Sequence, residues 1–177
     1  LFPVHPAYLE MFELVTVIEK RQVLKALSRE IRALLDKNIP DDEPGLISFD
    51  AYWAMIKEDA SYRTIPEIRD VLKCSQVLED RIASGMAVKT YQAPALRVIQ
   101  ALALHRVTVG DTRAPVGLTA KELRDRLCLS IPIPEPDASF LLTSVEAVLT
   151  EISRTMNGQF TSHNRANGQY YLDLDKV

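Results

Sequence analysis

The C-terminal end of the chain carries the pattern that most restricts its fold. Two short runs of strand-like sequence, Gln159 to Ser162 and Gln169 to Leu174, are separated by a segment that ends in Asn167-Gly168. Asn-Gly is a strong signal for a turn between two strands, because both residues tolerate positive φ. We therefore predict a β-hairpin whose connection runs from His163 to Gly168.

Three helices are predicted before this hairpin. Apolar residues recur at helical spacing over about residues 94–107, 121–129 and 139–156, and loops rich in Gly and Pro separate these segments. Thr119 is suited to cap the second helix. Three helices followed by a terminal hairpin is the order of a winged helix-turn-helix domain. We predict such a domain over residues 93–177.

The first half of the chain also has helical periodicity. Helices are expected to begin at Pro6 and Pro66, and Ser48 and Asp50 are expected to cap a short helix between them. A further helix, over about residues 19–37, has one apolar side, made of Val23, Leu24, Leu27, Ile31, Leu34 and Leu35. Turn-forming residues from Pro40 to Gly45 interrupt the chain.

The predicted fold class is therefore mainly α. It consists of a helical bundle over residues 1–88 and the winged-helix domain over residues 93–177, with the junction between Gly85 and Ala93. Cys74 and Cys128 lie far apart in apolar helical segments, which indicates free buried thiols and a reducing compartment. No membrane-spanning run or secretory signal is present, so we expect a cytoplasmic protein without a membrane partner. Because the sequence begins at Leu1, we expect it to be a fragment of a larger protein.

The sequence lacks the motifs of common catalytic sites. It contains no phosphate-binding loop, no dinucleotide-binding glycine pattern, no nucleophile elbow and no HExxH zinc motif. The histidines His5, His105 and His163 are isolated from one another and from the two cysteines, which gives no zinc-ligand spacing. We expect neither an enzyme nor a metal or cofactor site in this chain.

A basic stripe is the clearest polar feature of the first half. It consists of Arg21, Lys25, Arg29 and Arg32 on the side of their helix opposite the apolar residues. Guanidinium groups bind phosphate in a forked geometry, so an arginine here could meet a nucleotide held by a neighbouring domain. The commoner explanation is a solvated helix face, which the spacing alone favours.

The contact surface of the predicted winged helix is weakly charged. On its third helix the side chains expected to face outward are those of Thr143, Glu146, Ala147, Thr150 and Arg154, with Glu151 close by. Residues 93–177 contain nine basic and nine acidic residues, and the whole chain has a formal charge of -3. Strong sequence-specific DNA binding is therefore not expected, and docking to a protein is at least as well supported.

The hairpin connection offers better contacts than the helix. His163, Asn164, Arg165 and Asn167 could reach a DNA groove or a phosphate backbone. The alternative for Asn164 and Asn167 is that they only form the turn. Tyr52, Trp53, Tyr170 and Tyr171 are expected to pack in the core or at a strand edge, because no basic groove accompanies them.

Several stretches of the chain resemble the large P-loop ATPases of BREX-type phage-resistance systems. These stretches cover nearly the whole chain: Leu1-Phe2-Pro3-Val4-His5-Pro6-Ala7-Tyr8, Phe12-Glu13, Glu19-Lys20-Arg21-Gln22-Val23-Leu24-Lys25-Ala26-Leu27-Ser28-Arg29, Asp42-Glu43-Pro44-Gly45-Leu46-Ile47, Glu122-Leu123-Arg124-Asp125-Arg126-Leu127-Cys128-Leu129, Gly158-Gln159-Phe160 and Asn167-Gly168-Gln169-Tyr170-Tyr171-Leu172-Asp173-Leu174. None of them is a catalytic signature.

The resemblance implies a parent protein with an AAA-like ATPase core upstream of Leu1, which would bind ATP and Mg²⁺. This chain would then be the helical lid of that core followed by a winged helix. Arg21, with Arg29 as the alternate, would occupy the place where such lids often carry a nucleotide-sensing arginine. The Walker motifs are absent from this chain, so it is not expected to hydrolyse ATP.

The function that follows is that of a non-catalytic regulatory and interaction segment. Its lid would close on nucleotide bound upstream, and its winged helix would dock duplex DNA or another phage-defence subunit. Two alternatives remain open at this point: a stand-alone winged-helix regulator that binds DNA, and a scaffold that contacts only protein.

Overall fold

The computed structural model describes residues 2–16, 18–39 and 45–176, and this part of the chain is mainly helical. Its α-helices are α1 (Pro6–Leu14), α2 (Lys20–Leu34), α3 (Ala51–Glu58), α4 (Pro66–Gly85), α5 (Gln92–Thr108), α6 (Ala120–Leu127) and α7 (Ala138–Thr155). Two 3-10 helices are η1 (Ala60–Thr64) and η2 (Lys89–Tyr91), and the strands are β1 (Leu118–Thr119), β2 (Thr161–Asn164) and β3 (Gln169–Leu172). The strands form an antiparallel sheet in the order β1-β3-β2.

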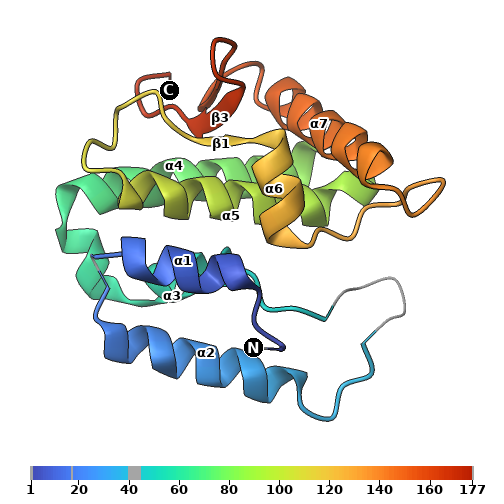
Figure 1. The fold of residues 1–177 in the computed structure, drawn as a ribbon. Coiled ribbons are helices and arrows are strands. Elements are labelled where there is room, and N and C mark those ends of the chain that lie inside the picture. The colour runs from blue at the N-terminus through green and yellow to red at the C-terminus, as the bar shows by residue number, and fades with distance from the viewer. Residues whose placement is uncertain (1, 17, 40–44, 177) are drawn as a thin grey trace.

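The elements stack in three levels (Figure 1). The antiparallel pair α4 and α5 lies in the middle, with α1, α2 and α3 on one side and α6, α7 and the sheet on the other. Helix α5 is buried on nearly all sides, because apolar residues occur around its whole circumference instead of on one stripe. It therefore serves as the common core of the two outer levels.

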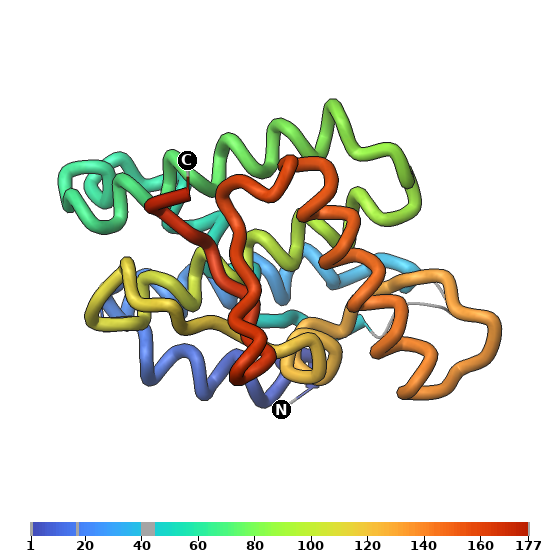
Figure 2. The backbone as a smooth tube through the Cα atoms, turned by 90° about the horizontal axis from the view of Figure 1, so that it is seen from above, coloured from blue at the N-terminus to red at the C-terminus, as the bar shows by residue number. Residues whose placement is uncertain are grey.

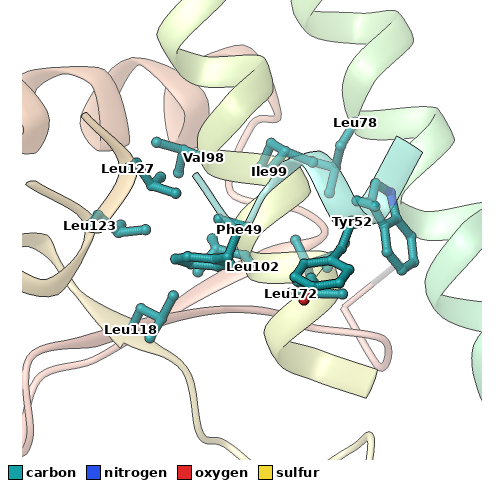
Figure 3. Packing of buried hydrophobic residues seen from close by; sticks show 14 of the residues in the cluster. Phe49, Tyr52, Leu78, Val98, Ile99, Leu102, Leu118, Leu123, Leu127 and Leu172 are labelled. Carbon is teal, nitrogen blue, oxygen red and sulfur yellow. The ribbon is translucent and has the colours of Figure 1, made fainter. Parts of the chain in front are cut away.

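One buried apolar cluster crosses the predicted junction between the two halves. Figure 3 shows Phe49 and Tyr52 from the first half lying beside α5 and the sheet residues of the second half. Trp53 is fully buried as well and donates its indole N–H to the hydroxyl of Ser75 (2.8 Å). The prediction that Tyr52 and Trp53 pack in the core is confirmed. The division into residues 1–88 and 93–177 stays a prediction, with a continuous core across it.

The predicted starts of three helices are confirmed. Interactions between residues close together in the sequence determine these features. Proline occupies the first turn of α1 and of α4, where a missing N–H costs nothing. Helix α4 ends at Gly85, where the predicted junction begins. Thr119 and Glu122 form a capping box at the start of α6, in which each side chain accepts from the backbone N–H of the other residue.

The predicted cap of α3 is wrong. Asp50 stands at the N-cap position but makes no capping hydrogen bond. Its carboxylate instead accepts from Nε and Nη2 of Arg97 on α5 (2.8 and 3.1 Å). Arg97 also donates to the hydroxyl of Ser48 and to the carbonyls of Leu127 and Cys128. These bonds join the start of α3, the middle level and the end of α6.

The outer face of α2 also departs from the prediction. Val23 and Ala26 are buried, but Leu24 and Leu35 are 60% and 63% exposed. The apolar side of this helix is wider than the strip that the neighbouring helices cover, so part of it stays in solvent. The predicted turn from Pro40 to Gly45 lies outside the described residues except for Gly45, as do parts of the stretches that carry the family resemblance.

Several details of the second half also differ from the prediction, since the hairpin strands are Thr161–Asn164 and Gln169–Leu172. Strand β1 is a two-residue strand inside a segment predicted as loop. Helix α6 ends at Leu127 because Cys128 adopts the left-handed conformation (φ 49°). Strand β2 extends to Asn164, so His163 and Asn164 belong to a strand and not to the connection. No helix in the described ranges is both long and apolar enough to cross a membrane.

Candidate functional site

A groove between α7 and the hairpin collects four of the seven predicted contact residues. The two elements run side by side at the outer surface of the molecule (Figure 2), and the groove between them has a volume of about 630 Å³. We call it the α7–hairpin groove. Its polar lining residues are Thr150, Ser153, Arg154, Asn157, Thr161, Ser162, His163, Arg165, Tyr170 and Lys176. Thr150, Arg154, His163 and Arg165 are the predicted contacts among them.

The groove exists because the chain reverses sharply after α7. Val145, Val148, Leu149 and Ile152 anchor α7 in the core. The next residues, Asn157 and Gly158, both have positive φ (51° and 71°), and the N–H of Gly158 donates to the carbonyl of Ser153 (2.9 Å). This helix ending turns the chain back as β2 along the outer face of α7.

The charges that line the groove are all basic. Arg154, Arg165 and Lys176 carry full positive charges, and no aspartate or glutamate is among the lining residues that the structure describes. The nine acidic residues of this half therefore lie elsewhere, which sequence counting alone could not reveal. Guanidinium and ammonium groups in such a groove are suited to bind phosphate or carboxylate groups.

One buried acidic side chain forms an ion pair with an arginine that lines the groove. Glu151 is buried in α7, and its Oε2 accepts from Nη1 of Arg154 (2.9 Å). Glu151 therefore lies near the outward-facing residues of α7, as predicted, but is itself buried. Glu146 is exposed, as predicted, and burial together with the charge of Glu146 raises the pKa of Tyr170.

His163 is held by an aromatic partner. Its ring stacks on Tyr170 of β3, with centroids 4.0 Å apart and planes inclined by 2°. The pairing of the two strands places these residues opposite each other. His163 and Tyr170 therefore line the groove as a stacked pair.

Asn164, Asn167 and Thr143 do not line the groove. Asn164 accepts from the N–H of Ala166 and Asn167 from the N–H of Gln169, both at 3.0 Å, so their side chains stabilise the turn. Thr143 is exposed on α7, where its hydroxyl donates to the carbonyl of Ser139 (3.1 Å). These three residues belong to α7 and the hairpin, but their side chains do not line the groove.

Arg21 and Arg29 lie on α2, on the opposite side of the central pair from α7 (Figure 1). Nη1 of Arg29 donates to Oε2 of Glu58 (2.8 Å), and this carboxylate raises the pKa of the arginine. Arg21 is exposed and forms no ion pair with any residue that the structure describes. The structure therefore does not bring the stripe and the groove together.

Two basic residues of the second half, Lys176 and Arg106, were not predicted from the sequence to have a special place. Lys176 completes the basic lining of the groove, but it follows the hairpin in sequence and no motif marks it. Arg106 of α5 is only 1% exposed and donates to the carbonyls of Leu172 and Ala114. Its guanidinium also lies 5.1 Å from the ring centre of Tyr171, and burial lowers its pKa.

Within the described ranges, no group of three His, Cys, Asp or Glu side chains could hold a metal ion. Cys74 is buried, and burial raises the pKa of its thiol to about 12, so the thiolate is scarce at neutral pH.

Comparison with known proteins gives one positive result. A family model described as the DUF6079 second domain matches residues 1–177. No curated protein and no solved structure matches the chain. Since the family model covers the full sequence, the chain belongs to the DUF6079 second-domain family.

Proposed function

We propose that this chain is a non-catalytic docking module that binds the phosphate backbone of duplex DNA in the α7–hairpin groove. Residues 92–176 would form a winged helix, with α7 as its recognition helix and the β2–β3 hairpin as its wing. The order of helices and strands and the sheet order β1-β3-β2 support this assignment.

The observation that carries the proposal is the sign of the charges in the groove. Arg154, Arg165 and Lys176 meet there without an acidic residue in the described lining, although the module as a whole is neutral. Lysine and arginine contacts to phosphate give affinity that depends on salt and hardly on sequence. The module would therefore hold DNA without selecting a particular site.

We also propose a role for this chain within a longer parent protein. The family's description as a second domain supports a longer parent protein. The resemblance to BREX-type ATPases implies that this parent has an ATP and Mg²⁺ site upstream. The helical segment over residues 1–88 would then act as the lid, and the winged helix would relay the nucleotide state to DNA or to another subunit. In such a lid Arg21 is the better candidate for the nucleotide contact, because Glu58 already engages Arg29.

Fluorescence anisotropy with a labelled duplex, at low and at physiological salt, tests DNA docking. With up to three phosphate contacts, the logarithm of the binding constant should fall with the logarithm of salt concentration with a slope of about -2 to -3. The double variant Arg165→Glu/Lys176→Glu should lose at least tenfold in affinity. Lys25→Glu/Lys89→Glu, which makes the same charge change on exposed residues outside the groove, is the matched control.

Two results would count against DNA docking: no binding at low salt, or equal losses in the two double variants. The first would favour the protein-only scaffold, for which the pairing of Arg154 with buried Glu151 is the supporting observation. A strong preference for one duplex sequence would favour the stand-alone regulator.

The lid is tested separately in the full-length parent, where Arg21→Ala should weaken ATP binding or turnover more than Arg29→Ala.

A further inference from the structure

A second concave surface lies between α3, η1 and α4, away from the α7–hairpin groove. Its volume is about 750 Å³, and we call it the α3–α4 hollow. The residues that line it are Ala54, Lys57, Glu58, Arg63, Arg69, Leu72, Lys73 and Gln76. None of them lines the groove, so whatever the hollow binds is independent of the proposed DNA contact.

The floor and the rim of the hollow differ in chemistry. Ala54 and Leu72 supply apolar surface, and the aliphatic stems of the basic side chains extend it. The rim carries four cations, Lys57, Arg63, Arg69 and Lys73, against one carboxylate, that of Glu58. An apolar floor inside a basic rim matches a ligand that has apolar groups flanked by negative charges.

The rim charges are only partly neutralised by the protein. Lys57 is paired with Glu79 (2.6 Å), while Arg69 has only its sequence neighbour Asp70, at 3.7 Å. Glu58 is engaged by Arg29. Arg63 and Lys73 are exposed, and no carboxylate of the described residues lies within ion-pair distance of either. At least two cations are thus available to a partner.

The geometry points to the α3–α4 hollow as a docking site for an acidic amphipathic helix of a partner protein. Such a helix would place apolar side chains, spaced three or four residues apart, on Ala54 and Leu72. Its flanking Asp and Glu residues would face Arg63, Arg69 and Lys73. Charge complementarity selects this occupant over DNA, whose backbone offers no apolar group for the floor. The concave shape selects it over a membrane, which needs a protruding apolar face to insert.

A designed peptide tests this site directly. The probe is a fluorescein-labelled 16-residue helix with Leu on one face and Glu on both flanks, titrated into the whole chain. A scrambled peptide of the same composition has the same charge but no apolar face. The amphipathic peptide should bind with micromolar affinity and the scrambled peptide at least tenfold more weakly. Amide shifts in an NMR titration should fall in α3, η1 and α4.

Two variants separate the charged and the apolar contributions. Arg63→Glu/Lys73→Glu should weaken peptide binding at least tenfold and, because both residues are exposed, should leave the fold intact. Ala54→Phe fills the hollow without a charge change and should also weaken binding; circular dichroism checks its fold. Lys89→Glu/Lys121→Glu, outside the hollow, is the charge-matched control and should bind normally. Arg165→Glu/Lys176→Glu should bind the peptide normally too, which separates this site from the DNA groove.

Three outcomes would overturn the inference. The first is no binding of the amphipathic peptide. The second is equal binding of the scrambled peptide, which would mean that net charge alone attracts both peptides. The third is an equal loss in Arg63→Glu/Lys73→Glu and in its control, or amide shifts located at α7 and the hairpin.

Discussion

Arg154 and Glu151, one turn apart on α7, form an ion pair whose two sides differ in exposure. The donor and acceptor atoms are 2.9 Å apart, and the carboxylate side chain is 6% exposed while the arginine side chain is 73% exposed. A phosphate in the α7–hairpin groove must therefore share Arg154 with a buried negative charge. The ion pair limits how strongly this arginine can bind an external anion.

Replacing Glu151 by its neutral isostere should strengthen DNA binding. In Glu151→Gln, Arg154 is freed from the carboxylate and the repulsion between carboxylate and phosphate disappears. We expect a gain of about fivefold at low salt, equivalent to about 1 kcal/mol, measured by anisotropy. Glu135→Gln, an exposed acid before α7, is the control. Unchanged affinity in Glu151→Gln would mean that Arg154 makes no contact with DNA.

The bonds of Arg97 should be among the most important for stability. Asp50 is 6% exposed, so Arg97→Met leaves a buried carboxylate without its partner. We expect the free energy of unfolding to fall by about 3 kcal/mol, measured by urea denaturation. Arg63→Met, at an exposed arginine without an ion pair in the described chain, should change it by less than about 0.5 kcal/mol. In Arg97→Met/Asp50→Asn the loss should be smaller than in Arg97→Met.

Gly117 should not tolerate any side chain. A Cβ placed there would lie 1.9 Å from the carbonyl oxygen of Tyr170, a backbone atom of β3. Gly117→Ala must push β1 away from β3, at an expected cost of about 2 kcal/mol. Gly110→Ala, where a Cβ meets nothing within 4 Å, is the matched control and should leave the melting temperature nearly unchanged. Equal melting temperatures of the two variants would contradict this prediction.

Burial of Cys74 should make the protein sensitive to alkali. Burial raises the pKa of its thiol from about 9 to about 12, so between these values the unfolded chain loses a proton that the folded chain keeps. The contribution to stability is therefore complete below pH 9 and is lost as the pH rises toward 12. Cys74→Ala should show a shallower decline in the free energy of unfolding over this range. Parallel declines in the two proteins would exclude Cys74 as a source of this sensitivity.

The predictable parts of the fold are those fixed by local chemistry. The starts of α1 and α4 follow from their prolines, and the capping box of α6 from Thr119 and Glu122. The hairpin follows from Asn167-Gly168, of which only Gly168 uses positive φ (72°). The connection was predicted too long because the pairing of His163 with Tyr170 extends β2 beyond its alternating pattern.

The remaining features depend on partners distant in sequence. Strand β1 has two residues and is defined only by its pairing with β3. Asp50 could not be distinguished from a helix cap, because Arg97 comes 47 positions later. In the candidate site, Arg154 and Arg165 were found from their exposed positions. Lys176 was missed because it reaches the groove only after the chain has turned twice.

Arg106 attaches the hairpin to the centre of the molecule. At its root, Arg106 Nη2 donates to the carbonyl of Leu172 (2.7 Å), which attaches β3 to the central helix α5. At its tip, the side chains of Asn164, Asn167 and Gln169 form hydrogen bonds within the hairpin and with the N–H of Gly117, just before β1. The hairpin is therefore held near both ends, by α5 at its root and by β1 near its tip, where Thr119 pairs with Gln169. A pull on Arg165 would be transmitted to α5 through β3 and to α6 through β1.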